Sequence, residues 1–321
     1  MPHVDSLALV TPDRPTCLTI GGFDGVHRGH QQVVVSLVGA ASRRHFRTAV
    51  LSFFPLPKQV VGNGEPRFYL TSPDDRARLL QQLGIDLVVT LPFDQQLREM
   101  RATDFVDLLL ERLDLREIWV GPDFALGYQR EGDVDFLKKQ GQAKGFEVCT
   151  VDFFRLAAGN PLAGRGPIVS SSLIRQALRE GRLQDANHWL GRPYRIAGQV
   201  VHGDQRGRSL GFPTANLSVW EEQVMPARGV YAGCAWLDNE RRPAAVNIGV
   251  RPTVTAGETL TVEAHLIDLD CDLYGKDLAV DLYAPIRPEF RFDSREALTA
   301  QMARDVEEAR QVFLSAPAWG G

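Results

Sequence analysis

The first half of the chain alternates short apolar runs with amphipathic segments. We expect the apolar runs to be buried strands, at residues 17–20, 49–53, 87–91, 118–120 and 147–151. Between them, apolar residues recur at helical spacing, first within residues 33–41 and then at Phe105, Leu108, Leu109 and Leu113. Thr103 stands where a helix N-cap is expected, and Gly145 stands where a glycine should end a helix. This alternation predicts a parallel sheet covered on both faces, with ligands bound beyond the carboxyl ends of its strands.

The pattern changes near Gly181. Two short helices are expected at residues 173–180 and 183–190, each ended by a glycine, Gly181 and Gly191. After Tyr194, polar and apolar residues alternate with period two in segments 196–202, 230–236, 244–250, 261–267 and 278–283. These segments predict an antiparallel barrel or sandwich. A final helix should begin near Asp293 or Ser294, with an apolar stripe of Leu298, Met302, Val306, Ala309 and Phe313.

The length of the chain and this change of pattern predict two domains. A chain of 321 residues exceeds the usual size of one domain. We place the boundary within the second of the two short helices, so that the domains span residues 1–186 and 187–321.

Charge and composition restrict the expected partners. The chain has 36 Lys and Arg against 40 Asp and Glu, a net charge of −4, so no nucleic-acid partner is expected and any phosphate site must be built locally. The N-terminus lacks the pattern of a signal peptide, and no apolar run is long enough to span a bilayer. The 4 cysteines form no C-x-x-C pair, which predicts reduced structural thiols in a cytoplasmic protein. Small molecules are the expected partners, and self-association is left open.

A segment rich in glycine and histidine, GGFDGVHRGH at residues 21–30, lies between the first expected strand and the first expected helix. Glycines let the backbone turn sharply and approach a phosphate, and a helix N-terminus offers amides and partial positive charge. If the turn is helical, His27 and His30 point the same way because they are three residues apart. Two imidazole donors there suit a triphosphate whose α-phosphorus is attacked. The alternative is a pair of surface histidines in a glycine-rich loop.

Hydroxyl groups and an arginine follow in VSSSLIR, at residues 169–175. On its own, this segment is typical of a helix N-cap at Ser171 or Ser172, with Arg175 as a solvated helix residue. Together with the histidine segment, the same side chains would form a second clamp on the phosphates.

Two segments of the second half carry candidate chemistry. In GRSLGFPTANL, residues 207–217, Thr214 and Asn216 offer oxygen ligands on one side if the backbone is extended, which suits Mg²⁺ held together with substrate phosphates. The alternative is a proline-containing turn with small polar residues. In residues 261–268, Glu263 and His265 share one face of an alternating strand, either as functional groups or as solvated residues of the outer face.

The N-terminal motifs resemble a known family. GGFDGVHRGH, VGPDFALG at residues 120–127 and SSSLIR at residues 170–175 occur in the order of the nucleotidyltransferase module of prokaryotic bifunctional riboflavin kinase/FAD synthetases. The resemblance implies a Rossmann-like domain that transfers an adenylyl group from ATP to FMN without a covalent intermediate. It implies that His27 and His30 hold the ATP phosphates and that Ser171, Ser172 and Arg175 close over the β- and γ-phosphates. The other implied ATP- or flavin-binding residues are Gly21, Phe23, Asp24, Gly29 and Asp123.

The second half resembles the riboflavin kinase domain of the same family from residue 190 to the last helix. The matching segments are GRSLGFPTANL, GVYAG at 229–233, NIG at 247–249, VEAHLIDLDCDLYGK at 262–276 and IRPE at 286–289. The resemblance implies a six-stranded antiparallel barrel with a C-terminal helix. It implies Thr214 and Asn216 at Mg²⁺-ATP, and Glu263 as the base that receives the ribityl 5′-hydroxyl proton. Gly207, Arg208, Gly211 and Pro213 would line the ATP or flavin site.

Three positions depart from the family pattern. Gly22 stands where the family often has a side chain such as Asn, and Phe54 and Leu56 stand where an acidic residue and a histidine are common. We therefore expect an α/β enzyme that makes FMN and then FAD, with Mg²⁺ and with ATP as co-substrate at both sites. One alternative is a riboflavin kinase whose adenylyltransferase domain is weak or inactive. Another is a flavin-binding protein without turnover, which would need neither the magnesium ligands nor a base.

Overall fold

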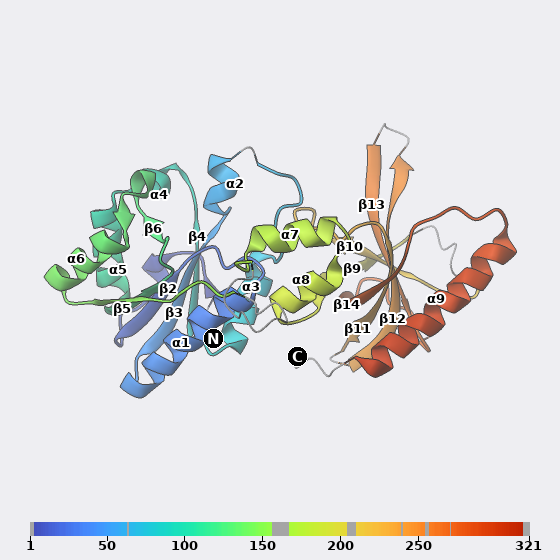
Figure 1. Ribbon diagram of the computed structural model, residues 1–321, viewed down its shortest axis with the longest axis horizontal. Coiled ribbons are helices and arrows are strands. Elements are labelled where there is room, and N and C mark those ends of the chain that lie inside the picture. The colour runs from blue at the N-terminus through green and yellow to red at the C-terminus, as the bar shows by residue number, and fades with distance from the viewer. Residues whose placement is uncertain are drawn as a thin grey trace. The chain divides into compact units, whose positions relative to one another are not determined.

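The computed structural model describes residues 3–62, 64–155, 167–203, 210–238, 240–253, 257–269 and 271–316, without side chains at 251–253 and 257–259. The chain divides into two compact units, Met1–Ser171 and Ser172–Gly321 (Figure 1). The expected boundary between residues 186 and 187 falls inside a helix of the second unit, and as a boundary between functional domains it stays a prediction. Among the described helices, none is long and apolar enough to cross a membrane.

The first unit contains a parallel sheet in the order β1-β4-β3-β2-β5-β8. Its strands are β1 (His3–Val4), β2 (Thr16–Ile20), β3 (Arg47–Phe54), β4 (Leu87–Pro92), β5 (Leu115–Val120) and β8 (Glu147–Thr150). The helices are α1 (Arg28–Arg44), α2 (Pro57–Val61), α3 (Pro73–Gln82), α4 (Gln95–Glu99), α5 (Ala102–Leu113) and α6 (Val134–Lys144). Short elements complete the unit: η1 (Leu7–Leu9), β6 (Ala125–Leu126), η2 (Tyr128–Arg130) and β7 (Gly132–Asp133). The parallel sheet is confirmed, and β1 is a strand that the sequence pattern did not predict.

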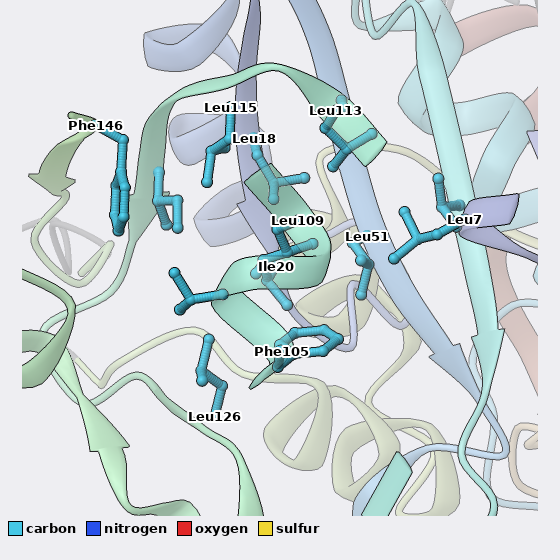
Figure 2. Packing of buried hydrophobic residues seen from close by; sticks show 14 of the residues in the cluster. Leu7, Leu18, Ile20, Leu51, Phe105, Leu109, Leu113, Leu115, Leu126 and Phe146 are labelled. Atoms are coloured by element: carbon cyan, nitrogen blue, oxygen red, sulfur yellow. The ribbon is translucent and has the colours of Figure 1, made fainter. Parts of the chain in front are cut away.

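Both faces of this sheet are buried, as its continuous apolar strands require. Figure 2 shows Phe105, Leu109 and Leu113 of α5 near Leu18 and Ile20 of β2 on one face. On the other face, α1 and α3 pack against alternate strand residues such as Cys17, Val50 and Val88. Period-two strand geometry sends neighbouring residues of β2 to opposite faces, so each face has its own core.

One predicted cap is confirmed and another is wrong. Gly145 ends α6 in the left-handed conformation. Thr103 does not begin α5, because the helix starts at Ala102 and its N-cap is Arg101. The carboxylate of Glu131 accepts a hydrogen bond from the Ala102 N–H at 2.7 Å and pairs with Arg101. A residue distant in sequence therefore caps this helix, which local sequence does not reveal.

The second unit is a closed antiparallel barrel in the order β10-β13-β12-β11-β14-β9, as the family resemblance implied. Its strands are β9 (Tyr194–Val201), β10 (Ala215–Val219), β11 (Gly229–Leu237), β12 (Glu240–Thr253), β13 (Gly257–Leu266) and β14 (Asp277–Pro288). The helices are α7 (Ser171–Arg179), α8 (Leu183–Leu190) and α9 (Arg295–Ser315). The final helix begins as predicted, with Ser294 as its N-cap. It packs on the outside of the barrel, where Ala309 meets Ala232 and Ala245.

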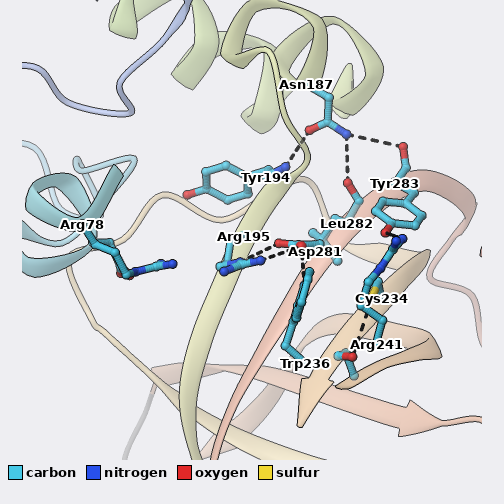
Figure 3. Close-up of polar contacts among 12 residues, drawn as sticks. Arg78, Asn187, Tyr194, Arg195, Cys234, Trp236, Arg241, Asp281, Leu282 and Tyr283 are labelled. Atoms are coloured by element: carbon cyan, nitrogen blue, oxygen red, sulfur yellow. Dashed lines mark hydrogen bonds and ion pairs between the residues drawn. The ribbon is translucent and has the colours of Figure 1, made fainter. Parts of the chain in front are cut away.

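Helix α8 is fastened to the barrel by hydrogen bonds, drawn in Figure 3. The side chain of Asn187 donates to the carbonyl oxygen of Leu282 and accepts from the Tyr194 N–H, both at 2.8 Å. Nearby, Arg195 forms a two-point ion pair with Asp281. The predicted C-cap glycine Gly191 ends α8, as expected.

Candidate active sites

The two histidines of the first motif form a stacked pair at the N-terminus of α1. Their ring centroids are 3.6 Å apart and their planes differ by 18°. His27 is not helical: it is the N-cap, and its Nδ1 accepts a hydrogen bond from the His30 N–H at 3.4 Å. A neutral imidazole whose Nδ1 accepts carries its proton on Nε2, so His27 has a donor to offer. The histidines therefore lie together as predicted, although through capping and not through helical spacing alone.

Gly29 and Phe23 hold this pair in place. A Cβ added at Gly29 would lie 3.1 Å from Cε1 of His27, so the ring lies close against the helix backbone. Phe23 is buried, and its ring lies 4.9 Å from that of His30. It belongs to the core beneath α1, where it supports His30.

Asp24 connects the motif to a neighbouring segment. It is buried and accepts hydrogen bonds from the backbone N–H groups of Leu70 and Thr71, at 3.0 and 3.1 Å. The Thr71 hydroxyl accepts in turn from the Gly25 N–H at 3.1 Å. The Asp24 carboxylate thus shapes the loop. Thr71 is a partner that sequence motifs did not indicate.

The remaining first-unit candidates lie after neighbouring parallel strands. Gly21 follows β2, and its N–H extends the sheet by donating to Leu51 O. Asp123 lies in an exposed turn after β5, where its carbonyl oxygen accepts a hydrogen bond from Arg130. Because the carboxyl ends of parallel strands meet at one edge of a sheet, Asp123 belongs to the same edge as the histidine motif.

The structure brings Ser171 to the motif. Its hydroxyl donates to the main-chain oxygen of Asp24 at 2.9 Å. Ser172 and Arg175 follow on α7 and are grouped with the second unit, and Arg175 is buried. Their closing over ATP phosphates stays a prediction.

Two of the three departures from the family pattern are neighbours in space. A Cβ added at Gly22 would lie 3.2 Å from Cδ2 of Leu56, which is buried. The Gly22 carbonyl accepts from Ser52, whose hydroxyl also accepts from Arg76 at 2.8 Å. The third departure, Phe54, packs on Tyr69. An apolar contact therefore occupies this part of the sheet edge.

In the barrel, Glu263 lies between two asparagines. Strand pairing places it opposite Asn216 of β10 on one side and opposite Asn247 of β12 on the other. Directly opposed residues of antiparallel strands project from the same face. Val262 and Ala264 are buried in the barrel interior, so this polar row lies on the outer face.

The outer face at Glu263 is hollowed into a cavity of about 450 Å³. Polar side chains of the lining are Thr214, Asn247, Glu263, His265, Arg287, Glu289 and Asp305. Apolar ones are Phe212, Val230, Ala245, Phe290, Phe292, Leu298, Met302 and Val306. Such a volume and mixed lining suit a small organic ligand with an apolar ring and a polar tail. Glu263 is thus an outer-face residue that lines a cavity, and its role as the base stays a prediction.

His265 anchors the GFPTAN segment beside Glu263. Its Nδ1 lies 2.7 Å from the Pro213 carbonyl oxygen, and since that oxygen only accepts, Nδ1 must carry the proton. The ring also meets Phe212 edge-on at 5.6 Å. Thr214, next in the chain, lines the cavity. The alternating pattern placed His265 on the face of Glu263 but did not reveal this anchoring.

The other predicted residues of this segment differ in position. Asn216 is paired with Glu263 but does not line the cavity, and its amide lies against Gly203. Gly211 precedes Phe212 in a left-handed conformation. Gly207 and Arg208 lie outside the described residues.

An ion pair in the lining of the cavity joins the barrel to α9. Arg287 contacts both carboxylate oxygens of Asp305 at 2.8–3.0 Å. Its guanidinium lies 4.5 Å from the ring centroid of Phe290 and 5.6 Å from that of Phe292. Sequence reasoning missed this arrangement. The signal was Asp305, a charged residue inside the apolar stripe of the last helix.

The oxygen donors of Thr214 and Asn216 in the barrel fit a magnesium ion that takes most of its ligands from phosphate oxygens and water. The described residues contain no group of three or more His, Cys, Asp or Glu side chains that could hold a metal by itself. Thr214 and Asn216 supply neutral oxygens beside the Glu263 carboxylate. Mg²⁺ commonly takes few protein ligands together with phosphate oxygens and water.

The four cysteines are free thiols. Burial, together with the adjacent Glu117, raises the pKa of Cys17 to about 12. A thiol with so high a pKa stays protonated near neutral pH and is a poor nucleophile. This agrees with the structural role expected from the sequence.

Comparisons with known proteins match both halves. A family model described as riboflavin kinase matches residues 190–313, and one described as FAD synthetase matches residues 10–160. The bifunctional riboflavin kinase/FMN adenylyltransferase of Escherichia coli K12 is 39% identical over 310 residues, 96% of each chain. The protein of that description from Pseudomonas fluorescens is 38% identical over 325 residues, 99% of each chain.

A solved structure from Streptococcus pneumoniae supports the fold. It is described as a macrolide-efflux protein, covers 99% of both chains with a TM-score of 0.86, and is 27% identical. Its description says nothing about flavins, whereas the two family models and the curated relatives agree with each other. The chain belongs to the bifunctional riboflavin kinase/FMN adenylyltransferase family.

Proposed function

We propose that the barrel cavity is the riboflavin site and that Glu263 is its general base. The observation that carries this proposal is one cavity whose lining joins Thr214 and Glu263 to aromatic and aliphatic side chains. Riboflavin has the same division, a polar ribityl chain on an apolar ring system. The ring would lie against Phe290, Phe292 and α9, and the ribityl chain would reach toward Glu263.

Phosphorylation then follows from the position of Glu263. The ribityl 5′-oxygen attacks the γ-phosphorus of ATP while its proton passes to the Glu263 carboxylate. The new O–P bond forms as the bond to the β-γ bridging oxygen breaks, and ADP leaves with that electron pair. Thr214 and Asn216 are proposed to hold Mg²⁺-ATP, and a metal bound there would supply positive charge toward the transferring phosphoryl group.

We assign adenylyl transfer to the edge of the parallel sheet. The phosphate of FMN attacks the α-phosphorus of ATP, and pyrophosphate leaves. The stacked His27 and His30, with the positive end of the α1 dipole, are proposed to stabilise the triphosphate and the departing charge. Ser171, Ser172 and Arg175 are proposed to close over the β- and γ-phosphates. Gly21, Phe23, Asp24 and Gly29 shape this site, and Asp123 borders it.

Supplying riboflavin with Mg²⁺-ATP, and separately FMN with Mg²⁺-ATP, tests both assignments when FMN and FAD are resolved as products. His30→Ala should lower FAD formation sharply while FMN formation survives, because the kinase residues lie in the other unit. Loss of both activities in a folded variant would contradict the two-site assignment. Unchanged FAD formation would contradict the role of His30.

The apolar contact between Gly22 and Leu56 is the one observation that favours a weak adenylyltransferase. The matched FAD synthetase model and the bifunctional relatives favour an active one. The rate of FAD formation, when FMN and Mg²⁺-ATP are supplied without riboflavin, decides between the two.

The free thiols and the use of ATP support a cytoplasmic location, which cell fractionation would test. Self-association stays an open prediction, to be measured by light scattering.

A further inference from the structure

Glu289 places a further carboxylate in the cavity, beside Asn247. It follows β14 and lines the cavity with Glu263 and Asn247. A Cβ added at Gly249 would lie 2.2 Å from Oε1 of Glu289 and 3.3 Å from Nδ2 of Asn247. The carboxylate and the amide therefore converge over Gly249, and they can do so only because that residue lacks a side chain.

Both polar groups remain open to a ligand. Within the described part of the chain, neither the Glu289 carboxylate nor the Asn247 amide forms a hydrogen bond or ion pair. The cation beside Glu289 in sequence, Arg287, is committed to Asp305. Strand pairing sets Asn247 opposite Glu263, so the open pair adjoins the proposed base.

We propose that Glu289 is a positioning residue for riboflavin, which with Asn247 binds the secondary hydroxyls of the ribityl chain. A carboxylate accepts hydrogen bonds from hydroxyl groups, and an amide both donates and accepts. Such contacts fix the chain so that its terminal 5′-hydroxyl meets Glu263. This inference rests on the proposed assignment of the cavity to riboflavin.

A comparison of two flavins isolates this role. Riboflavin and lumiflavin share the ring system, but lumiflavin has a methyl group in place of the ribityl chain. Glu289→Gln should weaken riboflavin binding by roughly tenfold or more, since hydrogen bonds to a charged group are the stronger kind. Lumiflavin binding should change less than about twofold, because its ring does not use the Glu289 contact. In turnover, KM for riboflavin should rise with little change in kcat.

Two further variants make the result decisive. Glu308→Gln removes the same charge from an exposed position of α9 outside the cavity and should alter neither flavin's affinity. Glu263→Gln tests the cavity itself: if it leaves phosphorylation intact, the proposed function fails. If Glu263→Gln impairs phosphorylation but Glu289→Gln weakens both flavins equally, or neither, the role of Glu289 is wrong and the cavity assignment stands.

Discussion

Glu263 is half-buried on the outer face of the barrel, and its neighbours explain how a carboxylate is held there. Asn216 and Asn247 oppose it on the two adjacent strands, and His265 fixes the backbone that precedes Asn216. The Pro213 carbonyl oxygen sets the tautomer of His265 in this arrangement. In the first unit, His27 likewise has its tautomer set by one backbone N–H.

Gly22 and Leu56 should behave as a coupled pair. Gly22→Asn places new atoms against the Leu56 side chain, and overpacking of this kind costs about 1–3 kcal/mol of stability. Leu56→Ala makes room, so the double variant should lose less free energy of unfolding than the two single losses added together. Urea unfolding of the four proteins of this cycle measures the coupling. Additive losses would show that the two side chains do not interact.

At the scale of elements, α9 forms one wall of the barrel cavity, and we expect its place on the barrel to depend on Asp305. Asp305 is buried and holds Arg287, whose guanidinium covers Phe290 and Phe292. The helix also contributes Leu298, Met302 and Val306 to the cavity. The ion pair between Arg287 and Asp305 thus links the packing of α9 on the barrel to the shape of the cavity.

Asp305→Ala should destabilise the second unit by about 2–3 kcal/mol, because it leaves Arg287 without its carboxylate in a half-buried place. KM for riboflavin should also rise as the aromatic wall loosens. Urea unfolding and the dependence of the FMN-forming rate on riboflavin concentration measure the two effects, with the exposed Glu308→Ala as a control for charge loss on α9. If the Asp305→Ala variant is as stable as the control and its KM for riboflavin is unchanged, the ion pair between Asp305 and Arg287 does not hold α9 in place.

The local sequence predicted the helices and strands better than it predicted the contacts between them. Alternation with period two marked β12 and β13 but not β10, and helical spacing marked α9. Strand β1 was missed because two residues carry no periodicity, and the N-cap of α5 was misplaced because Glu131 reaches it from elsewhere in the chain. Glu263 meets Asn216 and Asn247 through strand pairing, and Arg287 meets Asp305 through an ion pair. Both arrangements join distant segments of the chain, which no local pattern encodes.

At the scale of the whole molecule, the proposed kinase site lies within one compact unit. The cavity residues all fall within Ser172–Gly321, and the stacked histidines fall within Met1–Ser171. Helix α8 is grouped with the barrel and is bonded to it through Asn187. The kinase activity should therefore be separable from the first unit.

A fragment of residues 172–321 should fold alone and phosphorylate riboflavin. A shorter fragment, 187–321, keeps the kinase motifs but loses α7 and the buried Leu183 and Ala186 of α8. It should make FMN as well, but with a lower urea midpoint, since lost apolar burial costs stability. Circular dichroism and FMN formation check both fragments. A folded fragment 172–321 that makes no FMN would mean that the kinase site borrows residues from the first unit.

The replacement Glu263→Gln tests the central claim most directly. It keeps the shape of the side chain but removes its charge and basicity, and general-base catalysis is worth about 10²–10⁴-fold. Turnover of riboflavin to FMN should fall by roughly that factor while riboflavin affinity and the adenylylation of supplied FMN stay unchanged. The measurement is kcat for each half-reaction, with a riboflavin titration of the same protein. A loss of FMN formation smaller than about tenfold would contradict the account, because removing a general base should cost at least about 10²-fold.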